Sequence, residues 1–204
     1  MQSSSHMIEK TTAKKNRLKL ALIFSMAFVP MLLAYYMYTS QAFIPEGRTN
    51  NGILLAMPLD FNAIELNGEA GALKNIEGTW KLVTAVSGDC DDQCAKNLYL
   101  MRQVNTALHK ESHRVKRLLL VDKPLSVKAQ ELVSGAHPQL TTAQFSLDQY
   151  RQWLEEGGVK SVLETPQILV VDPLGNMMMY YHAENTGKDM LTDIKRMLKV
   201  SKLG

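Results

Sequence analysis

The chain has 204 residues, of which 46% are hydrophobic and 21% are charged, a balance typical of a folded protein that argues against wholesale disorder. Its two cysteines exclude a four-thiolate zinc site and a scaffold held by several disulfides. The net charge of +3 is concentrated in residues 1–19, which carry five bases and one acid, so the remainder lacks the basic face of a nucleic-acid binder and we expect no nucleic-acid partner.

An uncharged segment, residues 20–38, follows this basic tail. Its nineteen residues are about the number needed to cross a bilayer core of roughly 30 Å at about 1.5 Å per residue. Because the bases precede the span, the positive-inside rule places the N-terminus in the cytoplasm and the rest outside. We therefore predict a single-pass protein of a bacterial inner membrane with its C-terminal domain in the periplasm. The alternatives are a cleaved signal peptide and a buried core helix.

Residues 39–59 are predicted to be a tether, and residues 60–204 a folded domain. Residues 61–66, followed by Asn67-Gly68, predict a short hairpin. Hydrophobic periodicity and turn residues predict strands at 80–86, 117–121, 139–143, 167–171 and 176–181, and helices at 91–110, 126–134, 146–156 and 186–198. This order predicts an α/β fold with a thioredoxin-like mixed sheet flanked by helices, preceded by one N-terminal transmembrane helix.

Cys90 and Cys94 lie where the first long predicted strand turns into a helix. A separation of four residues brings both sulfurs to one helix face, and a helix start favours a thiolate. Asp91 and Asp92 oppose this by like-charge repulsion, so we expect only modest activation. The pair is either a functional dithiol, with Cys90 attacking and Cys94 resolving, or a structural disulfide; the position after a strand and before a helix favours the dithiol.

Pro166 is the third predicted site residue. It precedes the strand expected at residues 167–171, and a cis-proline in that place borders the dithiol in thioredoxin folds. An X–Pro bond is cis in only about 5–6% of cases, so the prediction depends on this context. We expect Pro166 to shape the surface on which a partner docks.

The chain resembles the Sco/SenC family of membrane-anchored cytochrome c oxidase assembly proteins. The resemblance rests on Gly78-Thr79-Trp80 ahead of the two cysteines, on residues 140–142 (LTT) and on residues 171–176 (VDPLGN). It implies a thioredoxin fold that binds copper through Cys90, Cys94 and one histidine. It also implies a respiratory oxidase subunit or another assembly factor as the partner.

Three positions depart from the family pattern. The prolines expected after the cysteines are Asp91 and Ala95, and the copper histidine falls at Glu164. Because copper(I) prefers sulfur and imidazole ligands, we expect no cofactor to be required, with copper at the two cysteines as an option. The leading hypothesis is thus a thiol–disulfide oxidoreductase assisting oxidase assembly. The alternatives are a copper(I) chaperone of Sco type and a non-catalytic scaffold with a structural disulfide.

Several other side chains suggest metal binding but have simpler interpretations. His182 follows a predicted strand, where a solvated histidine is commoner than a substitute copper ligand. Of the three methionines at residues 177–179, at most Met177 and Met179 can share one strand face, and they are expected to pack in the core rather than bind copper. His109 and His113 are expected at the surface. No glycine-rich phosphate loop or G-x-S-x-G motif is present, so hydrolases and nucleotide enzymes have no support.

Overall fold

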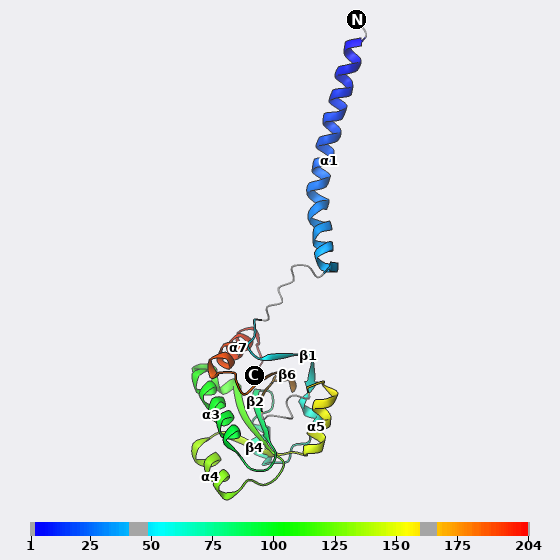
Figure 1. Cartoon of the computed structure of the whole chain (residues 1–204). Helices are drawn as coiled ribbons and strands as arrows, with labels where there is room; N and C mark the ends of the chain where they lie inside the picture. The colour runs from blue at the N-terminus through cyan, green and yellow to red at the C-terminus, as the bar shows by residue number, and fades with distance from the viewer. Residues whose placement is uncertain (1–2, 41–48, 160–166, 204) are drawn as a thin grey trace. The chain divides into compact units, whose positions relative to one another are not determined.

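The computed structural model describes residues 3–40, 49–159 and 167–203 (Figure 1). The chain forms two compact units, residues 1–48 and 49–204. The first contains helix α1, Ser3–Ser40, with Pro30 inside it. Its part Lys19–Ser40, whose most apolar window of 18 residues has a mean hydropathy of 2.0, is the one helix among the described residues that is long and apolar enough to cross a membrane, by length and composition.

The second unit is built on a six-stranded mixed sheet of order β1-β6-β5-β2-β3-β4. Strand β2 pairs in parallel with β3, and β3 with β4, whereas β5, β6 and β1 add in antiparallel fashion on the other side. The strands are β1 Ile53–Asp60, β2 Trp80–Val86, β3 Val115–Val121, β4 Leu140–Gln144, β5 Ile168–Val171 and β6 Asn176–Tyr181.

Helices cover both faces of this sheet (Figure 1). Residues of α3 and α7 form the first core layer with one face, and α4 packs on the same side through Val133. Residues of α5, together with η1 and α2, form the second core layer with the opposite face. The helical segments are η1 Phe61–Ala63, α2 Ala70–Lys74, α3 Asp92–Ala107, η2 His109–Arg114, α4 Val127–Ala136, α5 Leu147–Glu156 and α7 Gly187–Val200.

The mixed sheet flanked by helices confirms the predicted fold class. Each predicted helix and strand from residue 80 onward is present, with bounds that differ by at most three residues. Side-chain caps explain the helix starts: the hydroxyls of Ser126, Ser146 and Thr186 each accept a hydrogen bond from a backbone N–H in the first turn of the helix that follows.

The region before residue 80 differs from the prediction. Residues 53–60, of which 53–59 were expected at the end of the tether, form edge strand β1 paired with β6. No hairpin forms at residues 61–66, where Asp60 instead caps a short 3-10 helix and Phe61 enters the second core layer. The domain therefore includes residues that were assigned to the tether.

Asp193 of α7 fixes the start of this domain. Its side chain is 2% exposed, and its carboxylate accepts hydrogen bonds from the backbone N–H groups of Asn51 (2.8 Å) and Gly52 (2.9 Å). The Tyr181 hydroxyl donates a longer bond of 3.4 Å to the same carboxylate. The segment that enters β1 is thus held to the last helix.

Met177 and Met179 are both buried, as predicted, but they do not share a face. Consecutive residues Val170 and Val171 of β5 pair with Met179 and Met177, so Met178 is an extra residue in β6. This β-bulge turns Met177 into the second core layer and leaves Met179 in the first. The two methionines lie on opposite faces because strand alternation fails at a bulge.

Candidate redox site

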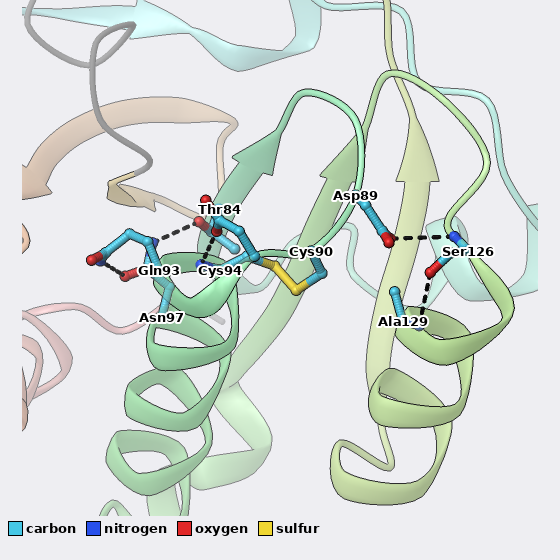
Figure 2. Close-up of a disulfide and its surroundings, with 9 residues drawn as sticks. Thr84, Asp89, Cys90, Gln93, Cys94, Asn97, Ser126 and Ala129 are labelled. Carbon is cyan, nitrogen blue, oxygen red and sulfur yellow. Dashed lines mark hydrogen bonds between the residues drawn. A yellow bond between two sulfur atoms is a disulfide. The ribbon is translucent and has the colours of Figure 1, made fainter.

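Cys90 and Cys94 form a disulfide at the start of α3, with their Cα atoms 5.2 Å apart (Figure 2). Cys90 stands just before the N-cap residue Asp91, whereas Cys94 is the third residue of the helix. Cys94 is fully buried in the first core layer, and Cys90 is only partly buried. Cys90 is therefore the more accessible residue of the pair.

The carboxylate of Asp91 occupies the helix start. It accepts a hydrogen bond of 2.8 Å from the backbone N–H of Cys94, which is one of the donors left unpaired by the helix. Asp91 and its neighbour Asp92 are both exposed. The favourable helix dipole at Cys90 is thus opposed by two adjacent negative charges.

Hydrogen bonds fix the loop between β2 and Cys90. Asp122, after β3, accepts bonds from the Ser87 hydroxyl (2.9 Å) and the Gly88 backbone N–H (2.7 Å). Gly88 has a φ of +90°, a conformation that favours glycine. Burial alone raises the pKa of Asp122, but these hydrogen bonds outweigh it and leave the pKa below its usual range.

Asp89 connects the same loop to α4. Its carboxylate accepts a 3.3 Å hydrogen bond from the backbone N–H of Ser126, the N-cap residue of α4 (Figure 2). A hydrogen bond with the Ser126 side chain lowers the pKa of Asp89. The position of Cys90 therefore depends on two carboxylates, Asp89 and Asp122, that the sequence alone did not single out.

A buried polar chain lies beside Cys94 on the other side of the disulfide (Figure 2). The Asn97 amide donates to the hydroxyl of Thr84 (3.1 Å), and the Gln93 amide donates to the Asn97 carbonyl oxygen (3.0 Å). Thr84 and Asn97 are 0% and 2% exposed. Two sequence signals were available: Thr84 interrupts an apolar strand, and Asn97 stands three residues after Cys94 on the apolar stripe of α3.

Pro166 and Glu164 lie outside the described residues, so their predicted roles are untested. Strand β5, which follows them, pairs antiparallel with β2, with Leu169 opposite Val83. The chain therefore enters β5 at the edge of the sheet where β2 leads to Cys90.

The histidines are placed individually by the structure. His109 and His113 are exposed, as predicted. His182 is partly buried, and its Nδ1 is 3.1 Å from Nε2 of Gln167. Its ring contacts Tyr180 edge-on, with centroids 5.5 Å apart.

The described part of the chain supplies only some of the side chains that a Sco-type copper site needs. No group of three or more His, Cys, Asp or Glu side chains positioned to hold a metal occurs there. Cys90 and Cys94 would supply two soft sulfur ligands once reduced, but no His, Asp or Glu among the described residues joins them in a group of three. They thus fit a Sco-type three-ligand copper site only in part.

Two family models match the chain. Residues 80–201, more than half of the chain, match the model described as transmembrane-like, thioredoxin-like, C-terminal domain. Residues 11–41 match the corresponding transmembrane-like, N-terminal domain. No curated protein sequence matches.

Solved structures share the fold at low sequence identity. The thioredoxin domain of a thiol-disulfide oxidoreductase from Bacteroides vulgatus is 13% identical, with a TM-score of 0.50 over 71% of this chain and 98% of that one. Yeast Sco1 is 15% identical, with a TM-score of 0.51 over 76% and 98%. Yeast Sco1 with copper bound is 16% identical, with a TM-score of 0.50 over 76% and 96%. At these identities the likeness establishes the thioredoxin-like fold that the sequence predicted.

Proposed function

Because the chain belongs to the family of transmembrane-like, thioredoxin-like proteins, we propose that it is a membrane-anchored protein that carries out thiol–disulfide exchange through Cys90 and Cys94. One observation carries this proposal: the disulfide joins a partly buried cysteine, Cys90, to a fully buried one, Cys94, at the start of a helix. A bond that only braced the fold would need no such difference in access.

The exchange proceeds in two balanced steps. In the reduced protein, the Cys90 thiolate attacks one sulfur of a partner's disulfide, and the other partner sulfur leaves as a thiolate and takes up a proton. The thiol of Cys94 then loses its proton and attacks Cys90 in the mixed disulfide, which releases the second partner sulfur. The partner gains two electrons and two protons, and the Cys90–Cys94 disulfide is restored. The reverse sequence oxidises a partner dithiol.

Residues around Cys90 and Cys94 have supporting roles in this proposal. The hydrogen bonds that the carboxylates of Asp89 and Asp122 accept hold the loop before Cys90. The Thr84–Asn97–Gln93 chain places polar groups beside the buried Cys94. Pro166 borders the docking surface in this proposal, which the direction of entry into β5 supports.

The test uses single cysteine variants of the full chain in the membrane. Cys94→Ser should accumulate mixed disulfides with partner proteins, because the resolving thiol is missing. Cys90→Ser should accumulate none, since the buried Cys94 is inaccessible. Equal trapping by both variants, or trapping by neither, contradicts the exchange mechanism.

The biological setting is a further part of the proposal. The one candidate span among the described residues, with the bases before it, supports a bacterial inner membrane with the domain in the periplasm, where disulfides persist. A reporter that is active only outside the cytoplasm, fused after Gly204, should be active. Activity of a cytoplasm-only reporter at that position would contradict this topology.

The partner we propose is a respiratory oxidase subunit or another factor of cytochrome c oxidase assembly. The support is the resemblance of the cysteine block and of residues 171–176 to the Sco/SenC pattern. Cells carrying Cys90→Ser or Cys94→Ser should lose oxidase maturation, and maturation at the wild-type level in both would contradict this role.

A further inference from the structure

A local excess of bases, which the near-neutral net charge of the domain conceals, lies at the end of helix α7. Residues 49–204 carry 17 bases and 18 acids, a net charge of −1, whereas residues 194–204 carry four bases and no acid. These four bases, here called the basic end, are all exposed: Lys195, Arg196, Lys199 and Lys202. Positive charge is therefore concentrated in the last residues of the domain.

The carboxylate that lies near the basic end has its own cationic partner. Lys195, Lys199 and Arg114 line a cavity of about 310 Å³, and Glu111 is the one acid among its described lining residues. The Oε2 atom of Glu111 lies 2.8 Å from Nη1 of Arg114, so that arginine offsets its charge. Lys195 and Lys199 thus keep positive charge that an anionic partner can neutralise.

Exposed apolar side chains accompany these bases. Val200 is 83% exposed and Leu203 is 53% exposed, although they stand next to Lys199 and Lys202. Lysines interspersed with exposed apolar side chains are typical of segments that lie in the headgroup region of an anionic bilayer, where the bases meet phosphates and the apolar groups leave water. This composition fits a phospholipid surface better than a purely ionic partner.

The path of the chain keeps this end within reach of the bilayer. Arg196 donates a hydrogen bond to the carbonyl oxygen of Thr49, and Asp193 accepts hydrogen bonds from the residues just before β1, so the segment that enters the domain lies against α7 (Figure 1). Thr49 follows Ser40, the last residue of the candidate span, by nine residues. A chain of that length reaches at most about 32 Å. The anchor therefore holds the basic end at a high local concentration near the membrane surface.

We propose that the basic end docks on anionic phospholipids of the membrane that anchors the chain, an inference that rests on the anchoring proposed above. Its lysines contact headgroup phosphates, and Val200 and Leu203 enter the headgroup region. Each base near such a surface strengthens docking about fivefold. Salt weakens this attraction because it screens exposed charges.

Docking in this way turns Cys90 away from the bilayer. Arg114, just before β3, donates hydrogen bonds to the carbonyl oxygens of Leu198 and Ser201, so the end of α7 lies at the edge of the sheet where β3 begins. Strand β2 runs parallel to β3 and leads toward Cys90 at its far end, about 20 Å away along the seven residues of the strand. The exchange site then faces partners on the side remote from the membrane.

Lysine acetylation of the full-length protein in nanodiscs, measured by mass spectrometry, tests the docking. In phosphatidylglycerol discs, Lys199 and Lys202 should react at least about fivefold more slowly than in phosphatidylcholine discs. Lys128 is the internal control, because it is exposed at the start of α4, beside the loop that leads to Cys90, and its rate should be the same in both lipids. Equal rates for Lys199 and Lys202 in both lipids, or an equal slowing of Lys128, overturns the proposal.

A double variant assigns the protection to these charges. In Lys199→Gln/Lys202→Gln, the slower reaction of Lys195 in phosphatidylglycerol should be lost. Lys123→Gln/Lys128→Gln removes two exposed lysines on the Cys90 side and should leave that slowing intact. Equal slowing of Lys195 in both double variants contradicts the assignment. Insertion into the discs reports the anchor separately: a chain that does not insert overturns the anchoring and this proposal with it, whereas insertion without protection overturns the docking alone.

Discussion

Replacing Asp91 by asparagine should make Cys90 more reactive without weakening α3. Asparagine removes the negative charge next to Cys90, and its side-chain oxygen can still accept the hydrogen bond from the Cys94 backbone N–H. Asp91→Ala removes both the charge and the cap. The two variants therefore separate the electrostatic effect of Asp91 from its structural one.

The expected magnitudes follow from the site. A like charge a few ångströms from a partly exposed thiolate costs about 1 kcal/mol, so removing it raises the thiolate fraction of Cys90 about fivefold near neutral pH. A thiolate of lower pKa is a weaker nucleophile, which leaves a net acceleration of about two- to threefold. Loss of the cap in Asp91→Ala should lower the free energy of unfolding by about 1 kcal/mol, whereas Asp91→Asn should change it little.

The assay is iodoacetamide alkylation of the reduced protein, followed by mass spectrometry, in a Cys94→Ser background that leaves Cys90 as the reacting thiol. Both Asp91 variants should react faster than the parent, and the difference should shrink at high ionic strength because salt screens exposed charges. Only Asp91→Ala should show reduced stability in urea unfolding. Equal or slower alkylation of Asp91→Asn would refute the electrostatic reasoning.

Three further predictions concern stability, pH and copper. Asp193→Ala should lower the free energy of unfolding by about 3–5 kcal/mol, because it leaves the buried N–H groups of the segment before β1 unpaired. Urea unfolding measures this change. A loss under about 1 kcal/mol contradicts the role of Asp193. Burial first, and then the Asp193 carboxylate, raises the pKa of Tyr181. Since the folded-state pKa of Tyr181 lies above the unfolded value of about 10, this contribution to stability is present below pH 10 and is lost as pH rises further. Urea unfolding from pH 8 to 11 should therefore show that the free energy of unfolding declines less steeply in Tyr181→Phe than in the unmutated protein. Identical slopes would count against this role of Tyr181. Finally, the unmutated reduced protein should bind copper(I) more weakly than Glu164→His in competition with a copper(I) chelator. Glu164→Gln is the control. Equally tight binding by the unmutated protein favours the copper(I) chaperone over the thiol–disulfide exchange protein.

The sequence predicted the elements whose apolar pattern is strong. The buried strands β2, β3 and β5 and the helices with clear caps were found because each carries its own signal in neighbouring residues. The position of the two cysteines was also predicted from local sequence, because a buried strand ends just before them and an apolar helical stripe begins with them.

Elements that depend on distant partners were missed. Strand β1 is largely exposed and contains Pro58, so its sequence has no alternating pattern, and pairing with β6 is what makes it a strand. The bulge at Met178 depends likewise on the register between β5 and β6. In the site, Asp89 and Asp122 are far apart in the sequence and act through contacts that only the fold creates.

One signal for a structural residue was present in the sequence. Asp193 lies on the apolar stripe of α7, three residues after Met190 and next to Ile194, both of which are buried. A carboxylate on a buried face requires donors, and in this fold they come from Asn51 and Gly52. Those donors lie 142 and 141 residues earlier, so their identity could not be predicted from local pattern.

The reduction potential of the Cys90–Cys94 pair tests the central claim most directly. The full-length protein is equilibrated with dithiothreitol or glutathione buffers, its thiols are trapped with a mass-tagged alkylating reagent, and the reduced fraction is plotted against the potential. A pair that exchanges electrons with partners should have a potential above about −300 mV. A value below that limit would indicate a disulfide that only braces the fold, and would contradict the proposed function.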